Sequence, residues 1–436
     1  MIKNNEHLKR EVGVLGLSAN IVNIIIGSGI FVLPATIAVL MGSASIIAYL
    51  FCGLLMALVM LCFAEAGSKV NNTGGPYTYI ETAFGDYAGF IAGCFAVSSN
   101  LFADAAVSNA LVNIITAAYP ALEATYFRLI FLIILFWGLA LINILGIKQG
   151  IGLVKLNTIL KLLPLSILII VGLPNITLSN LTIDSLPDLN TLGQASLILF
   201  FAFQGCETGI IVGGEVVNPK RTIPKAVLVS ISTVLVVYVL LQTVGQGILG
   251  NDFQNYEAAP LAETAKIVLG SFGFLLLTVG AVISMFGNMT GSILNSPRIV
   301  YALSRDNVIP IKFLSKIHKS YTTPYTAILV YVAISFTLTV FGSFKQSVII
   351  ATSSMLLLYL GVALSVIKLR QTKTTKAQEF KIPGGLTVPI LSILIIFYFL
   401  SNLASFEIIG TILIIISLSI IYVVIKFFQN KKTRIN

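Results

Sequence analysis

The sequence predicts an all-α integral membrane protein with about twelve transmembrane helices. Of its 436 residues, 57% are hydrophobic and only 10% are charged, whereas a soluble domain carries about 25% charged residues. The apolar residues form runs long enough to cross a bilayer, which takes about 20 residues. The charged residues lie between these runs, where topology signals are expected.

The apolar runs place the helices in order along the chain. A short amphipathic stretch, Ala258–Gly270, is expected to form a helix over the outer mouth, and the polar run Gln371–Lys381 a cytoplasmic linker. No segment is long enough for a separate soluble domain, so residues 1–436 are expected to form one transmembrane domain. The spans are expected at 12–40, 44–66, 83–117, 126–146, 150–173, 192–215, 223–249, 270–296, 324–342, 346–368, 387–405 and 407–428.

The lysines and arginines indicate the orientation in the membrane. With the N-terminus inside, only Arg128, Lys266 and Lys345 of the 27 cations fall in outer segments. Lys161 falls within a span, and every other cation falls in a segment expected to be cytoplasmic. Cytoplasmic loops carry the excess of lysine and arginine in membrane proteins. We therefore expect a cell-membrane protein with an even number of spans and both termini in the cytoplasm.

Composition and motifs exclude several classes of protein. The net charge of +10 is spread between apolar runs and does not indicate a nucleic-acid partner. The four cysteines lie inside apolar runs without a CxxC pair, so neither a disulfide framework nor a metal site is expected. The first apolar run is too long for a cleavable signal peptide. Phosphate-loop, zinc and serine-nucleophile motifs are absent from the sequence, so we expect neither an enzyme nor a cofactor.

The stretch Gly27–Phe31 interrupts the first apolar run. Each glycine in a helix interior costs about 1 kcal/mol relative to alanine, and unwound backbone at membrane depth persists only where it lines a cavity or is buried in protein. A helix that restarts here exposes N–H groups suited to an anion. We expect this break to bind a substrate carboxylate against Gly29, where a Cβ would intrude. The alternative is close helix packing through small residues.

A second interruption is expected in the span at 192–215, around Gln204 and Gly205. Glu207 lies in the same span, and an acid at membrane depth marks a functional site by default. Interrupted helices at the first and sixth positions indicate an inverted-repeat transporter with halves at about 12–173 and 192–368. Two extra helices at about 387–428 would follow. Three more glycines continue the second interruption: Gly209, Gly213 and Gly214.

Four stretches resemble motifs of the amino acid–polyamine–organocation (APC) superfamily of permeases, in the family's order. The resemblance covers about residues 10–430. It implies the LeuT-like fold, a 5+5 inverted repeat with broken helices 1 and 6 plus two C-terminal helices. It also implies secondary active transport of amino acids by alternating access, as a symporter or antiporter. The stretches are GSGIF at Gly27–Phe31, with Pro34 following; GGPYTYIETAFG at Gly74–Gly85, a loop in the family; FAFQGCETG at Phe201–Gly209; and NPKRTIPKA at Asn218–Ala226, also a loop.

The resemblance also implies where the substrate binds. The backbone at Ser28, Gly29 and Ile30 would hold the carboxylate. Phe201, or with poorer spacing Phe203, would close over the substrate; the alternative is a phenylalanine that faces lipid or the core. The carbonyl groups expected to hold the substrate ammonium lie at Ile24, Ile26, Phe203, Gln204 and Gly205.

Lys161 is the only cation deep within an expected span. Unpaired, it would cost several kcal/mol, so it needs a partner or must lose its charge. It resembles the helix-five lysine of many sodium-independent family members, whose ammonium stands where relatives bind sodium. This implies sodium-independent transport, by proton coupling or exchange. Lys161 could instead snorkel to the inner face, and Glu207 either pairs free backbone donors or carries a proton.

Asp104 and Asn100 lie mid-way along helix three, which contributes to the substrate pocket in the family. Asp104 would favour a cationic substrate, carry a proton, or be a hydrogen-bonded structural residue. For a neutral substrate we expect it to be protonated or bonded to Asn100 and Ser108. We favour a neutral amino acid, because no other acid is placed to hold a second cation; the alternative is a polyamine or cationic amino acid exchanger. The acids expected at the cytoplasmic gate are Glu65, Glu81 and Asp86.

An ion channel is the main alternative from another class. A channel usually needs a symmetric pore with a selectivity ring. Two broken helices in a single chain fit a carrier better. The expected partners are therefore an amino acid substrate, the lipid bilayer and possible protons. The sequence leaves the choice of amino acid, the coupling and the oligomeric state open.

Overall fold

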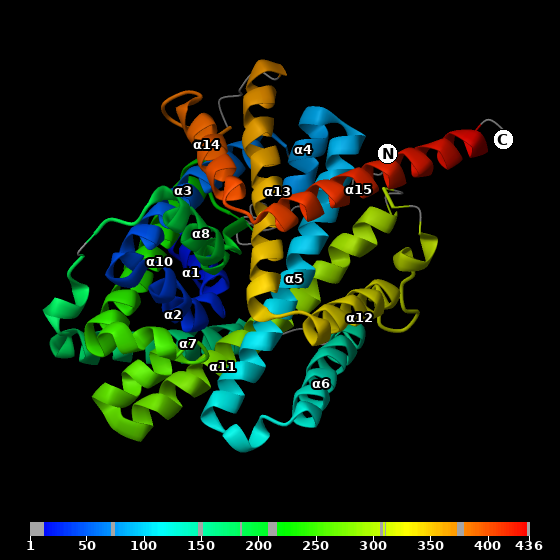
Figure 1. Cartoon of the computed structure of the whole chain (residues 1–436). Helices are drawn as coiled ribbons and strands as arrows, with labels where there is room; N and C mark the ends of the chain where they lie inside the picture. Colours follow the sequence, from blue (N-terminus) through cyan, green and yellow to red (C-terminus); the bar gives the residue numbers. More distant parts are fainter. Residues whose placement is uncertain are drawn as a thin grey trace.

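The computed structural model describes residues 13–70, 75–146, 151–183, 185–207, 216–305, 308–309, 311–372 and 379–433. Helices dominate this part of the chain, and it contains no strand (Figure 1). The prediction of an all-α protein is therefore confirmed. Gly74, Gly209, Gly213 and Gly214, which belong to the expected motifs and breaks, lie outside the described residues.

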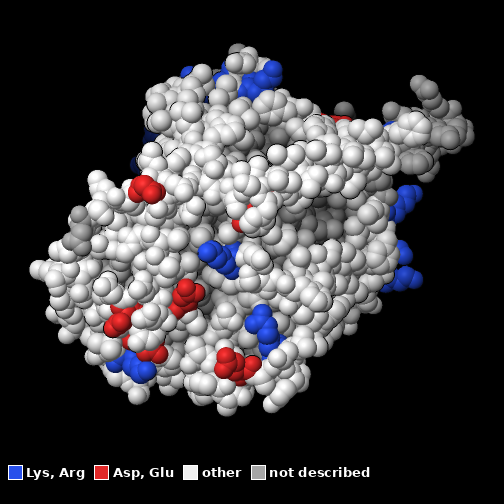
Figure 2. Space-filling view, in the orientation of Figure 1, with Lys and Arg blue, Asp and Glu red and all other residues white. Residues whose placement is uncertain are grey.

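The helices fall in the ranges expected from the apolar runs. Within the described residues, seven helices are long and apolar enough to cross a membrane, and five shorter apolar helices accompany them. Uncharged side chains cover most of the face shown in Figure 2. The chain is thus a multi-pass membrane protein, while the number of twelve crossings stays a prediction. The helices are α1 (Val14–Ile25), α2 (Gly29–Met41), α3 (Ser45–Lys69), α4 (Pro76–Phe84), α5 (Asp86–Ala118), α6 (Thr125–Ile144), α7 (Ile151–Gly172), α8 (Leu189–Leu199), α10 (Pro219–Leu249), α11 (Pro260–Arg305), α12 (Tyr325–Phe341), α13 (Phe344–Thr372), α14 (Thr387–Ser401) and α15 (Ser405–Thr433).

The two motifs expected as loops are largely helical. Residues 76–84 form α4, and α10 starts at Pro219 inside the fourth motif. In both cases a proline stands at the first helical position, where its missing N–H is not needed and its fixed φ suits the helix. Gly85, with φ of +86°, separates α4 from α5. The third expected span therefore begins after this glycine.

Helix α11 extends beyond its expected end, through Pro297 to Arg305. A proline inside a helix leaves the carbonyl four residues earlier without its N–H donor. Here that carbonyl belongs to Ile293, and the Asn143 side chain of α6 donates to it at 2.6 Å. A side chain from a neighbouring helix thus satisfies the freed group, as membrane-embedded proline requires.

The expected amphipathic helix before this span is also present. Residues from Pro260 run as helix to Gly270, whose φ of +65° bends the chain before the helix resumes. Only glycine adopts this conformation at little cost. The break between the short helix and the long span is therefore where the sequence placed it.

The helices pack into two groups with α13 between them (Figure 1). In one group α10 packs against α1 and α3, and α8 packs against α2 and α3. In the other, α5 packs against α11 and α12, and α6 packs against α12. Helix α13 contacts α5 on one side and α3 and α8 on the other. The interrupted helices both belong to the first group.

Candidate substrate-binding site

The first expected break is present between α1 and α2. Helix α1 ends at Ile25 and α2 begins at Gly29, so Ile26, Gly27 and Ser28 lie between the two helices. The second break follows the 3-10 turn Phe200–Phe203 at the end of α8, where Gln204 is extended and Gly205 has a φ of +106°. Both breaks lie at the expected residues.

The structure brings the two breaks against each other. A Cβ added to Gly29 would lie 2.6 Å from both the Cα and the Cβ of Ala202. A Cβ added to Gly205 would lie 2.9 Å from Ile24 Cγ2 and 3.4 Å from the Ile24 carbonyl oxygen. The glycines therefore permit backbone contact between the two interrupted helices, so the small-residue packing considered for the sequence is also real.

The start of α2 offers groups suited to an anion. Ser28 stands at the N-cap of this helix and is only 2% exposed. Its hydroxyl oxygen has no hydrogen-bond partner among the described residues. The first N–H groups of a helix have no partner within it, and the helix dipole favours negative charge there. Ser28, Gly29 and Ile30 thus form a buried, donor-rich turn.

The end of α1 presents carbonyl groups, and Lys161 holds two of them. Its ammonium donates to the carbonyl oxygen of Ile26 at 2.9 Å and to that of Asn23. Lys161 is 4% exposed, and its head points to the break. It does not snorkel to the inner face. The partner that a buried lysine needs is therefore the backbone freed by the break itself.

This contact corrects the expected role of Ile26. Its carbonyl oxygen lies within hydrogen-bond distance of Lys161 and also of the Ser284 hydroxyl in α11, at 3.3 Å. Ser284 also reaches the Gly27 carbonyl at 3.4 Å. Ile26 is thus engaged by the chain's own donors, because no water is at hand at membrane depth. The Ile24 carbonyl faces Gly205.

Tyr238 of α10, which was not expected at the site, joins the two breaks. Its hydroxyl lies 2.9 Å from the Ala202 carbonyl oxygen and 3.3 Å from that of Ile25. The available signal was a tyrosine in the middle of an apolar span, since a buried tyrosine hydroxyl usually has a partner. The Phe203 ring packs edge-on against Tyr238 at 5.3 Å. Phe203 is thus part of the core, which leaves Phe201, 8% exposed, as the candidate for closing over a substrate.

Glu207 pairs backbone donors at the second break. Its carboxylate oxygens accept from the Gly205 N–H at 3.1 and 3.2 Å. The Tyr359 hydroxyl of α13 donates to the same carboxylate at 2.6 Å. Gln204 also reaches α13, through a 3.1 Å bond from its amide to the Thr352 hydroxyl. Helix α13 therefore holds the second break on both sides.

Asp104 has a different partner from those expected. It is 1% exposed on α5, and its carboxylate accepts from the Tyr331 hydroxyl of α12 at 2.8 Å. Ser108 bonds the backbone carbonyl of Asp104, not its carboxylate. Asn100, half-buried on the same helix, lies one turn away. The side chain of Asp104 is turned to α12, a helix of the second group, and not to the breaks.

The bond to Tyr331 favours the structural alternative for Asp104, and this alternative has a testable signature. Asp104→Asn keeps an acceptor for Tyr331, so we expect little change in affinity for a neutral amino acid. Tyr331→Phe removes one of the two side-chain donors of the buried carboxyl and leaves Ser292 of α11, so the stability should fall by about 1 kcal/mol. Thermal unfolding and equilibrium binding of purified protein measure both. A selective loss of lysine or arginine binding in Asp104→Asn would instead place the carboxylate against the substrate.

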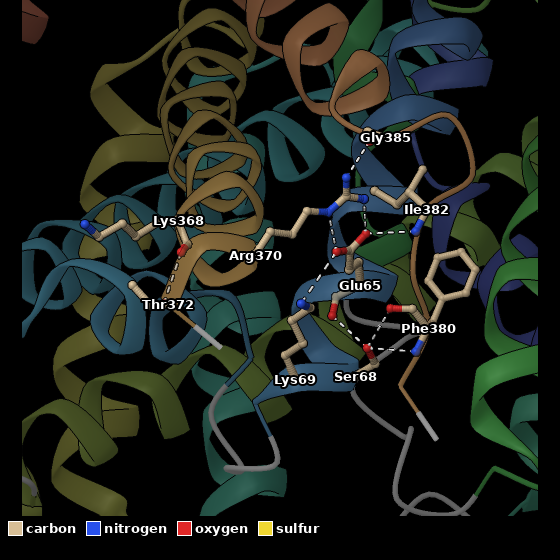
Figure 3. A network of polar contacts seen from close by, with 9 residues as sticks. All are labelled: Glu65, Ser68, Lys69, Lys368, Arg370, Thr372, Phe380, Ile382 and Gly385. Atoms are coloured by element: carbon tan, nitrogen blue, oxygen red, sulfur yellow. Dashed lines mark hydrogen bonds and ion pairs between the residues drawn. The ribbon is translucent and has the colours of Figure 1, made fainter. Parts of the chain in front are cut away.

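Glu65, one of the acids expected at a cytoplasmic gate, lies in a buried ion-pair network (Figure 3). Its fully buried carboxylate accepts from Arg370 Nε at 2.7 Å and Nη2 at 2.5 Å. The Ile382 N–H donates to it at 2.8 Å, and Lys69 lies 3.9 Å away. Arg370 also reaches the Gly385 carbonyl at 2.5 Å. The network therefore ties α3 to the end of α13 and to the segment before α14.

The two other acids expected at the gate are placed differently. Asp86 forms a 2.9 Å ion pair with Lys426 of α15. Glu81 lies on α4 and packs against Gly89 of α5: a Cβ added to Gly89 would lie 2.7 Å from the Cβ of Glu81. Glu65 is the acid that joins α3 to α13. The signal for Arg370 was the buried acid itself, since a carboxylate at this depth needs a charged partner.

Comparisons with known proteins show which transporters the chain is similar to. The family described as "Amino acid permease" matches residues 12–428. The serine/threonine exchanger SteT of Bacillus subtilis is 28% identical over 408 residues, 91% of each chain. The branched-chain amino acid permease BcaP of the same organism is 27% identical over 417 residues, 91% of this chain and 88% of its own. The large neutral amino acids transporter small subunit 2 of Oryctolagus cuniculus is 28% identical over 340 residues, 74% of this chain and 62% of its own.

Proposed function

The chain belongs to the amino acid permease family and is an amino acid transporter, and from that premise we propose that it exchanges neutral amino acids independently of sodium. The earlier expectation left proton coupling beside exchange. We favour exchange because SteT, which matches the chain over nearly its whole length, is named an exchanger.

The observation that carries sodium independence is the position of the Lys161 ammonium. It occupies the carbonyl groups at the end of α1, with the Ser284 hydroxyl beside it. Backbone carbonyls with a nearby hydroxyl also provide the oxygen ligands that a hard cation prefers. A cation belonging to the chain therefore takes the place that a sodium ion would take, and transport needs no sodium there.

The choice of a neutral substrate rests on the acids near the breaks. Asp104 faces Tyr331, and Glu207 is engaged by Gly205 and Tyr359. Among the described residues at the two breaks, no other carboxylate is available for a cationic side chain. The relatives SteT, BcaP and the large neutral amino acids transporter are likewise named for neutral amino acids.

The proposed substrate site lies where the two breaks meet. The donor-rich turn at Ser28, Gly29 and Ile30 holds the carboxylate, which also gives the Ser28 hydroxyl its missing acceptor. The ammonium binds carbonyl groups at Ile24 and at Phe203–Gly205, and Phe201 closes over the substrate. The short distance between Gly29 and Ala202 means that the two helices must part slightly to admit the ligand, as alternating access requires.

The finer fold follows the same proposal. We assign twelve spans with both termini in the cytoplasm and a 5+5 repeat, with halves at 12–173 and 192–368. The first packing group then contains spans one, two, six and seven, and the second contains spans three, four, eight and nine. In a repeat of five helices, spans one and two are equivalent to spans six and seven, and spans three and four are equivalent to spans eight and nine. The last two helices, at about 387–428, stand outside the repeat.

Counterflow into proteoliposomes tests the function. Vesicles containing the purified chain are loaded with unlabelled serine or leucine, and uptake of labelled neutral amino acid is followed. We expect uptake that depends on the internal amino acid and is unchanged when choline replaces sodium. Preference for lysine or polyamine would support the cationic alternative, and uptake driven by a proton gradient without internal substrate would support proton coupling. A steep sodium dependence at fixed membrane potential, or unitary currents in a bilayer, would overturn the proposal.

A further inference from the structure

A short segment between α11 and α12 combines exposed apolar and basic side chains. This basic–apolar segment comprises residues 311–322. Ile311, Phe313, Ile317 and Tyr321 are 51%, 50%, 49% and 44% exposed. Lysine and arginine side chains gather over this region, at the right edge of the view (Figures 1 and 2). The exposed lysines that alternate with the apolar residues are Lys312, Lys316 and Lys319.

The backbone of the segment is held in place, so this exposure is not the result of a loose loop. The Ser304 hydroxyl donates to the Ile311 carbonyl at 2.7 Å, and the Thr326 hydroxyl donates to the Phe313 carbonyl at 2.7 Å. Leu314 is buried beneath it. A turn closes the other end, where the His318 N–H donates to the Thr323 carbonyl at 2.8 Å.

The segment places a cation beside an apolar group at Lys316 and Phe313. Lys316 Nζ lies 5.2 Å from the centre of the Phe313 ring. A lysine can lay its apolar stem along such a surface while its ammonium reaches outward. Rows of exposed large apolar side chains are unfavourable in water. At a membrane surface the apolar groups enter the interface and the ammonium groups meet lipid phosphates.

We propose that the basic–apolar segment binds acidic phospholipid headgroups at the membrane surface. It directly joins two helices that lie in the membrane, so it must stand at the edge of the bilayer. Its charge complements anionic lipid, and its aromatic and aliphatic groups match the depth just below the phosphates. A soluble polyanion such as nucleic acid would match the charge and leave the apolar side chains uncovered.

Lipid at this segment would act on the transport machinery through α11. That helix ends beside the segment and carries Ser284, which touches the first break. Acidic lipid bound here would therefore change the position of α11, the helix whose Ser284 contacts the first break. This inference does not depend on which amino acid is transported.

Titration of purified full-length protein with short-chain phosphatidylglycerol tests the proposal. Binding is followed by thermophoresis, with phosphatidylcholine as the neutral lipid. We expect the combined variant Lys312→Gln, Lys316→Gln and Lys319→Gln to lose affinity for phosphatidylglycerol by roughly a hundredfold, since each surface lysine adds about a factor of five. Phe313→Ser should weaken binding without a change in charge.

A matched control removes three cations elsewhere: Lys266→Gln, Lys345→Gln and Lys426→Gln. This control should bind phosphatidylglycerol as the unmodified protein does. Equal losses in both variants would show that only the net charge matters and would overturn the proposal. So would equal binding of the two lipids, or full competition by glycerol phosphate, which would indicate a site for free anions. Thermal unfolding of all variants checks that they are folded.

Discussion

Replacement of Lys161 with methionine is expected to stop transport while the protein remains in the membrane. The ammonium donates to the Ile26 and Asn23 carbonyls where α1 ends. Methionine fills a similar volume and donates nothing, so both carbonyls lose a charged donor. A buried group left without its partner costs about 1–3 kcal/mol. The Asn23 carbonyl loses this donor and the Ile26 carbonyl keeps only the Ser284 hydroxyl, so we expect the transport rate to fall about a hundredfold.

The measurement is exchange in proteoliposomes at equal protein content. Lys345→Met, which removes an exposed cation on α13, is the matched control and should exchange amino acids normally. Titration of Lys161→Met with sodium distinguishes two outcomes. If sodium restores substrate binding in the variant, the ammonium indeed occupies a cation position. Normal exchange by Lys161→Met without sodium would show that the lysine has only a local packing role.

The helices could be predicted from the sequence because apolar runs and glycines act locally. Each expected span coincides with helix in the described residues. The errors are the helix α4, which forms where a loop was expected, and the ends of spans, where tertiary contacts decide. Asn143 from another helix satisfies the carbonyl that Pro297 leaves free, and α11 therefore continues. Spacing along one helix contains no information about such a partner on another helix.

The position of the candidate site could be predicted from the sequence, but the hydrogen-bond partners of its residues could not. Two breaks are visible as glycines and polar residues in apolar spans, and the need of Lys161 for a partner follows from its depth. The identity of that partner depends on how α7 meets α1. Tyr238 and Ser284 were missed for the same reason, since each serves the break from a helix distant in sequence. The role of Asp104 was left open between the pocket and a structural bond, because its direction around α5 could not be read from spacing; Tyr331 was not among the partners expected.

The close contact of the two breaks makes Gly29 the most sensitive position in the site. From the sequence, a side chain here should intrude on the carboxylate. In the structure it first meets the Cα and Cβ of Ala202, both at 2.6 Å. Real side chains do not tolerate such distances, and backbone on the opposite side cannot turn away as a flexible side chain would. A side chain at Gly29 must therefore push the two interrupted helices apart.

We expect Gly29→Val to abolish substrate binding and also to lower thermal stability, because it disturbs the packing of α2 on the second break. Overpacking of this kind costs about 1–3 kcal/mol, occasionally more. Gly138→Val is the matched control, since a Cβ at Gly138 on α6 meets nothing within 4 Å. Gly29→Ala combined with Ala202→Gly should recover only part of the stability, because the Ala202 Cα stays in place. Substrate affinity and unfolding temperature measure the effect, and normal affinity in Gly29→Val would remove the carboxylate from this break.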